Sequence, residues 1–150
     1  MIKEIENNNL KLIGNNQEDL KVISAYLQDS IVITQNIVFL KKNRIFLMIL
    51  NRYMWEDLEK GVFRTNKRVK CAVKLEEVIN VKSLNINQKN KNKILEFLAI
   101  KSTKNLNETY EIKFFFSGNS IITVVAEAIS IFLDDFGKSW NVKHAPKHKI

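Results

Sequence analysis

The side chains most suited to nucleophilic or metal chemistry are two histidines and one cysteine. His144 and His148 flank Pro146 in a basic stretch, and Cys71 lies in a segment where apolar residues alternate with others. A nucleophile needs a base held against it, and zinc needs three or four ligands. The histidines are expected to be solvated, and Cys71 is expected to be a small buried hydrophobe. The sequence therefore predicts no metal site and no cofactor.

Paired carboxylates are the remaining candidates for catalysis. Apart from Glu18-Asp19 at the predicted helix start, three adjacent pairs occur, at Glu56-Asp57, Glu76-Glu77 and Asp134-Asp135. Neighbours on a helix point about 100° apart, so they cannot share one proton as catalytic acid pairs do. Exposed turns and loops are the favoured location for such residues. The sequence favours a protein without catalytic activity, and a metal-free enzyme using dispersed carboxylates is the third hypothesis.

Binding is indicated where an apolar strand ends in large polar and aromatic residues. Trp and Arg are enriched at binding hot spots. Our first hypothesis is a small non-catalytic interaction domain that binds a protein partner here, through Arg52, Tyr53, Trp55 and Glu56. In the structural alternative, Trp55 closes the end of the sheet while Arg52 pairs with Glu56 or Asp57. An uncovered apolar strand face would instead indicate a homodimer.

The second hypothesis is binding of RNA or another polyanion, because the formal net charge is +8. Only four of the 24 basic residues are arginine, whose planar fork suits phosphate and base edges. Lysine enriched together with Asn and Ile is typical of an AT-rich genome. A lysine-protected sheet edge is the structural alternative. The candidate polyanion-binding residues are Arg64, Lys67, Arg68, Lys70 and Lys74.

These residues are expected to lie on an antiparallel sheet. A helix is predicted after Asn15-Asn16, which can cap it, with Glu18-Asp19 at its positive end. Strands are predicted at 31–33 and 37–40, joined by a hairpin at Gln35-Asn36. A closing C-terminal helix is predicted from the spacing of apolar residues and a Gly stop, at Ala128, Ile129, Phe132, Leu133, Phe136 and Gly137.

The 150 residues fit a single domain. We predict an α+β domain at 10–140, with flexible termini at 1–9 and 141–150. Its antiparallel sheet is expected to curl into a roll or partial barrel, similar to a pleckstrin-homology roll, with an N-terminal helix and a closing C-terminal helix. No run approaches the ~20 apolar residues of a membrane span, and no signal peptide is recognised. With one cysteine, the expected location is cytoplasmic.

Three segments resemble a family with no assigned chemistry. They are EDLKVISAYLQDS, RIFLMILNRYMWE and SGNSIITVVAEAISIFLDDFG. Over Leu10 to Trp140 the chain resembles an uncharacterised alphaproteobacterial family, domain of unknown function 2948. The resemblance implies a bacterial cytosolic protein of about this length and supplies no catalytic residue. It rests on Leu27-Gln28-Asp29, on Asn51-Arg52 with Trp55-Glu56, and on Leu133-Asp134-Asp135-Phe136-Gly137.

Overall fold

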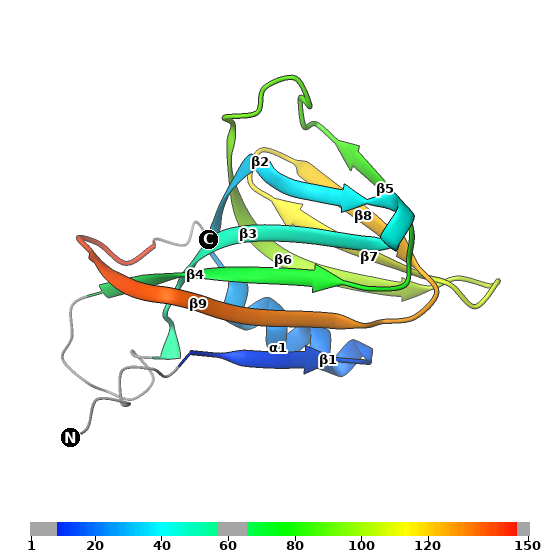
Figure 1. The fold of residues 1–150 in the computed structure, drawn as a ribbon, viewed down its shortest axis with the longest axis horizontal. Helices are drawn as coiled ribbons and strands as arrows, with labels where there is room; N and C mark the ends of the chain where they lie inside the picture. Colours follow the sequence, from blue (N-terminus) through cyan, green and yellow to red (C-terminus); the bar gives the residue numbers. More distant parts are fainter. Residues whose placement is uncertain (1–8, 57–65, 147–150) are drawn as a thin grey trace.

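A computed structural model describes residues 9–56 and 66–146 (Figure 1). In this part the chain forms one open antiparallel sheet of nine strands, ordered β1-β9-β4-β3-β2-β6-β7-β8-β5, with one α-helix. The predicted antiparallel sheet is confirmed, and the fold is mostly β. The elements are β1 (Lys11–Gly14), α1 (Gln17–Leu27), β2 (Ile31–Leu40), the 3₁₀ turn η2 (Lys41–Asn43), β3 (Ile45–Tyr53), β4 (Asn66–Leu75), β5 (Val78–Leu84), β6 (Ile94–Lys104), β7 (Tyr110–Phe116), β8 (Ser120–Ala126) and β9 (Ile131–Val142).

Helix α1 packs beneath the sheet, between β1 and β6 (Figure 1). The Asn16 side chain accepts a hydrogen bond from the Asp19 backbone N–H at 2.8 Å, which caps the helix. Leu20, Ile23 and Leu27 are buried on one face. The predicted arrangement with a helix at each end of the sheet is wrong, because β1 is the first described element and α1 the second.

The core lies on the inner face of the sheet, which bends so that distant strands face each other. The Phe46 ring on β3 lies 5.9 Å from the Phe114 ring on β7, although two strands, β2 and β6, separate them in the sheet order. Phe97 on β6 lies 6.4 Å from Phe114 and 6.0 Å from Phe116. Tilted and edge-on aromatic contacts of this length stabilise packing beyond the area they bury.

Strand β2 replaces the predicted hairpin at Gln35-Asn36. Residues 31–40 form one strand whose register shifts between Val32 and Ile37. Its first part pairs with β6 at residues 31–33, and its second part pairs with β3 at residues 37–40. The bulge lets one strand serve both halves of the sheet. It also leaves one edge of residues 37–40 without a neighbouring strand.

The predicted closing C-terminal helix is wrong, because residues 131–142 form β9. Ile131, Leu133 and Asp135 are buried, while Phe132 and Phe136 lie on the other face. This is the period of two that a strand imposes. The apolar residues also fit helical spacing, but β1 and β4 pair with β9 on both sides and satisfy its backbone. Tertiary pairing therefore decides the conformation.

Gly14 provides a test of packing where β1, β9 and α1 meet. A Cβ atom here would lie 2.8 Å from Ile131 Cγ2, 3.0 Å from Ile23 Cδ1 and 3.1 Å from Asp19 Cβ. We expect Gly14→Ala to lower the free energy of unfolding by about 1–3 kcal/mol, because the core must shift to admit a methyl group. Urea unfolding should show a lower midpoint at an unchanged slope. An unchanged midpoint would contradict this packing.

Candidate functional site

A buried cluster of one arginine and two carboxylates lies at the end of β3. The Arg52 side chain is fully buried. Its Nε and Nη2 donate to Asp135 Oδ1 and Oδ2 at 3.0 and 2.6 Å. Its Nη1 and Nη2 donate to Glu56 Oε1 and Oε2 at 2.9 and 2.8 Å. Arg52 therefore binds both carboxylates in the bidentate geometry that a planar guanidinium favours.

Strand order explains this cluster. Asp135 lies on β9 and Arg52 on β3, with β4 between them. Two strand spacings separate their backbones by ~9.6 Å, which the long arginine side chain helps to span. Burial opposes the charge of Arg52, but its hydrogen bonds to Glu56 and Asp135 outweigh burial and raise its pKa. Arg52 stays charged and holds the two strands together.

Cys71 lies beside this cluster, opposite Asp135 in the β4–β9 register. The side chain is fully buried. Burial, followed by the negative charge of Asp135, raises the pKa of the Cys71 thiol. The residue therefore remains a neutral thiol at physiological pH, which does not suit nucleophilic catalysis.

Trp55 is held by contacts on two sides. Its Nε1 donates to the Gln28 backbone oxygen at the end of α1, at 2.8 Å. Its ring lies 4.6 Å from the Tyr53 ring in an edge-on arrangement. Tyr53 is itself buried, and its hydroxyl donates to Asn66 Oδ1 at 2.6 Å. The indole orientation is thereby fixed while part of the ring stays exposed.

The fixed Trp55 forms one wall of a surface groove against α1. We call this cavity of about 380 Å³ the Trp55 groove. The Arg52 guanidinium carbon lies beneath it, 5.9 Å from the centre of the Tyr26 ring. The lining residues are Lys21, Val22, Ala25, Tyr26, Trp55 and Glu56. The groove combines an apolar wall with one carboxylate and one ammonium group.

The structure separates the four residues of the predicted protein-binding site into two layers. Trp55 and Glu56 line the groove, whereas Arg52 and Tyr53 are buried beneath it. The pairing of Arg52 with Glu56 that the structural alternative predicted is confirmed. Asp135 was not predicted as the second partner, because adjacent acids suggested an exposed turn. An arginine in an apolar strand is a usable signal, since a buried cation needs an anion.

The helix wall of the groove was also missed. Val22 and Tyr26 flank the buried stripe of α1 and are spaced four residues apart, so they lie on one face. Val22 is 51% exposed although it is apolar. The available signal in the sequence was an apolar residue that lies outside the buried stripe of the helix.

The five predicted polyanion-binding residues differ in their surroundings. Arg64 lies outside the described residues. Arg68 Nη1 donates to the Asp29 and Asn51 backbone oxygens at 3.2 and 3.0 Å, and burial lowers its pKa. Lys74 pairs with Glu76 at 3.3 Å, and its Nζ lies 4.7 Å from the centre of the Phe132 ring. Lys67 is half-buried and Lys70 is exposed. Polyanion binding stays a prediction.

The described part of the chain shows neither a cluster of metal ligands nor a membrane-spanning helix. Within residues 9–56 and 66–146, no three His, Cys, Asp or Glu side chains cluster as metal ligands would. Over the same ranges, no helix combines the length and apolar character needed to cross a membrane.

Comparison with known proteins identifies one family. A family model described as a protein of unknown function (DUF2948) matches residues 10–148. No curated protein and no solved structure matches the chain.

The ion cluster predicts a large difference between two adjacent aspartates. Asp135→Ala removes one of the two anions around Arg52 and should lower the free energy of unfolding by about 3–5 kcal/mol. Asp134→Ala is the matched control, because Asp134 is exposed on the other face of β9. It should change stability by no more than about 0.5 kcal/mol. Urea unfolding of both variants measures this, and equal effects would contradict the role of Asp135.

Proposed function

The chain belongs to the DUF2948 family, whose description assigns no activity, and we propose that it is a small non-catalytic interaction domain. The proposed partner is a protein that binds at the Trp55 groove. The observation that carries this proposal is an apolar groove in which hydrogen bonds hold the Trp55 and Glu56 side chains before binding. A bacterial, cytoplasmic setting is part of the proposal, and the free thiol of Cys71 fits a reducing compartment.

Preorganisation supports protein binding at this groove. Trp55 is fixed by Gln28, and Glu56 is fixed by Arg52, so few side chains need to be ordered when a partner binds. Trp and Tyr contribute large contact areas with few rotatable bonds. Val22 and Tyr26 extend the apolar wall along α1. An apolar side chain of a partner, flanked by polar groups, suits this surface.

Val22→Asp tests the groove without disturbing the core, because Val22 is 51% exposed. We expect capture of a partner from a lysate of the source cells to fall about tenfold, a loss of ~1.4 kcal/mol. Leu106→Asp is the matched control, since Leu106 is a fully exposed apolar residue in the loop between β6 and β7. Quantitative mass spectrometry of tagged protein from both variants measures the effect.

Two results would contradict this assignment of the site. One is a partner captured equally by Val22→Asp and the wild type, with both folded. The other is captured material that disappears after nuclease treatment, which would favour the polyanion hypothesis.

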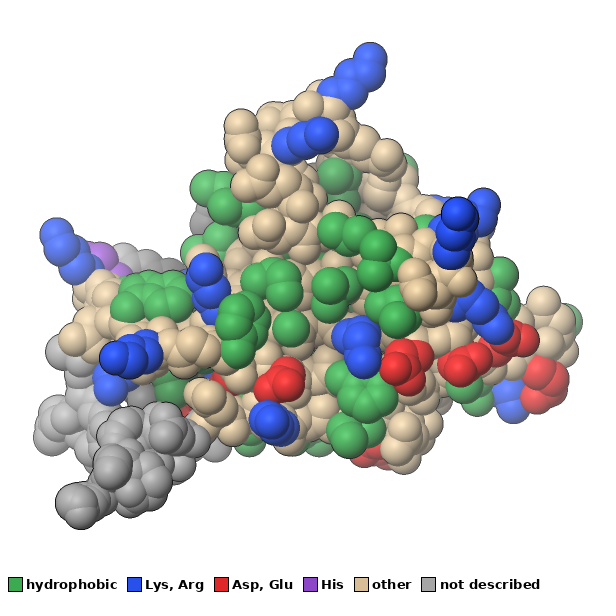
Figure 2. Space-filling view, in the orientation of Figure 1, with side chains coloured by type: hydrophobic (Ala, Val, Ile, Leu, Met, Phe, Trp, Pro, Cys, Tyr) green, Lys and Arg blue, Asp and Glu red, His purple; other side chains and the backbone are tan. Residues whose placement is uncertain are grey.

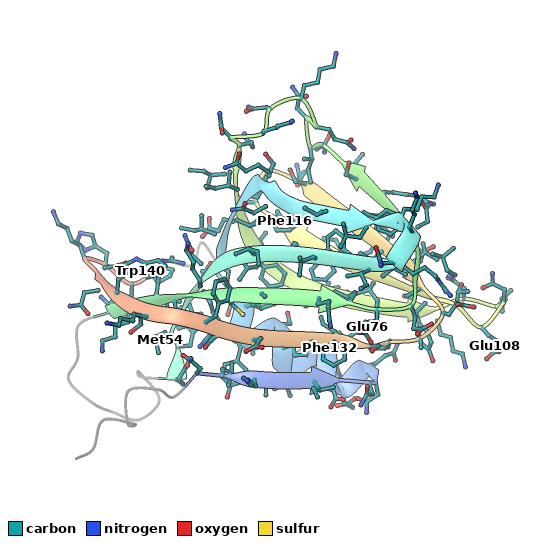
Figure 3. The ribbon with its side chains drawn as sticks, viewed as in Figure 1. Met54, Glu76, Glu108, Phe116, Phe132 and Trp140 are labelled. Carbon is teal, nitrogen blue, oxygen red and sulfur yellow. The ribbon has the colours of Figure 1, made fainter. Side chains whose placement is uncertain are left out.

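The outer face of the sheet supports a second candidate function, self-association. One continuous row crosses five strands, and all of its members except Lys74 are apolar: Ile13, Phe132, Lys74, Leu47 and Val38. Figure 2 shows hydrophobic side chains across this face, and Figure 3 shows Phe132 beside Glu76 near its lower edge. An antiparallel sheet usually keeps its solvent face polar. An exposed apolar face of this kind marks an interaction surface.

Leu47→Glu tests self-association, because Leu47 lies between Val38 and Lys74 in this row. We expect the wild-type protein to form dimers in a concentration-dependent manner and the variant to remain monomeric, since a carboxylate between packed sheets is not solvated. Sedimentation velocity over a concentration series measures this. Leu106→Glu is the control and should leave dimerisation unchanged. A wild-type protein that is monomeric at every concentration would contradict the second candidate.

A further inference from the structure

Two strand edges face each other across an opening in the sheet. Residues 37–40 of β2 pair with β3 on one side only, and β5 pairs with β8 on one side only. Figure 1 shows β5 alongside the end of β2 and diverging from it toward the loop that follows β5. Each edge presents backbone N–H and C=O groups that no neighbouring strand receives.

The opening is framed by backbone hydrogen bonds at both ends. At the narrow end, the Val78 N–H donates to the Arg44 carbonyl at 3.0 Å. At the wide end, the Thr34 and Gln35 N–H groups donate to Lys93 and Lys91 carbonyls at 2.9 and 3.0 Å. The frame therefore holds the two edges apart in the absence of any partner.

The two edges lie too far apart to pair with each other. Most Cα atoms of β2 and β5 are more than 8 Å apart. A strand inserted between two others needs them ~9.4–9.8 Å apart, which is twice the normal spacing. The part of β2 that has a free edge, residues 37–40, has four residues and spans ~13 Å. A segment added along this edge of β2 would therefore be short and extended.

The floor of the opening is apolar and reaches the core. A cavity of about 380 Å³ lies between the two edges. Its floor includes Phe46 and Ile122, which are both buried, and its walls include Ile37, Phe39 and Val81. Alternate side chains of an inserted strand would point at this floor, and the others would point outward. The inward positions therefore favour apolar residues.

The rim of the opening is basic. Lys82 on β5 lines the cavity. Lys89, Lys91 and Lys93 are exposed on the loop that bounds the wide end, and Figure 2 shows lysine side chains on this loop. The acidic residues at the narrow end, Glu77 and Glu127, form ion pairs with Arg44. Outward positions of an inserted strand would therefore favour acidic residues.

We propose that the opening between β2 and β5 binds a short extended peptide segment of a partner as an added strand, with apolar and acidic residues alternating. Main-chain hydrogen bonds to both edges supply affinity, and the apolar floor and lysine rim supply specificity. The site is separate from the Trp55 groove, because the two cavities have no lining residue in common.

The direct test uses a synthetic six-residue peptide of alternating glutamate and valine, with both ends blocked. Calorimetric titration should give an affinity at least tenfold higher than for the matched peptide of alternating lysine and valine. Amide hydrogen exchange should slow at residues 37–40 and 79–84 when the acidic peptide is bound. Methylating the backbone nitrogens of the peptide should abolish binding, because the added strand then loses its donors.

Two variants separate this site from the Trp55 groove. Val81→Asp should weaken the acidic peptide at least tenfold, because it places a carboxylate in the cavity wall. Val22→Asp should leave the peptide affinity unchanged, so failure of the groove and failure of this site are distinguishable. Absence of binding by folded wild-type protein would overturn the proposal. Equal affinity for the lysine peptide, or for the N-methylated peptide, would also overturn it.

Discussion

The pairing of Arg52 with Asp135 and Glu56 is the interaction on which the rest of this structure depends. A buried guanidinium is costly unless anions surround it, so β3 and β9 must place Arg52 and Asp135 on the same face. This requirement fixes which side chains of β9 point inward. The same guanidinium holds Glu56, which lines the Trp55 groove together with residues of α1. One cation thus links β3, β9 and the Trp55 groove.

Strand parity links this core to the outer surface. Once Asp135 points inward, Asp134 and Phe136 must point outward, and Lys70 and Phe132 follow from the register. The apolar outer row is therefore a consequence of the same register that buries the ion cluster. A shift of β3 by one residue would turn Arg52 outward, and a shift of β4 would turn Lys70 and Lys74 inward. The buried ion pairs therefore also determine which residues lie on the outer face. Stability and surface chemistry are set together here.

Short stretches of sequence were sufficient to predict an element where neighbouring residues alone determine its conformation. The Asn16 cap and the alternation of Val69, Cys71 and Val73 were readable from the sequence. Non-local pairing was not readable, since residues 131–142 satisfy helical and strand periodicity alike until β1 and β4 are in place. The groove followed the same rule: Trp55 and Glu56 were found, but Val22 and Tyr26 join them only through the tertiary fold.

The open sheet presents two chemically different surfaces, the strand edges of β2 and β5 and the Trp55 groove. A nine-stranded sheet that bends over its core without closing must leave edges, and here the bulge in β2 places one of them opposite β5. In the binding modes that we propose, backbone groups on these edges pair with an extended chain whose side chains the floor and rim select, whereas the Trp55 groove contacts side chains only. The first depends on the bend of the sheet and the second on the ion cluster. Substitutions can therefore alter either surface while leaving the other intact.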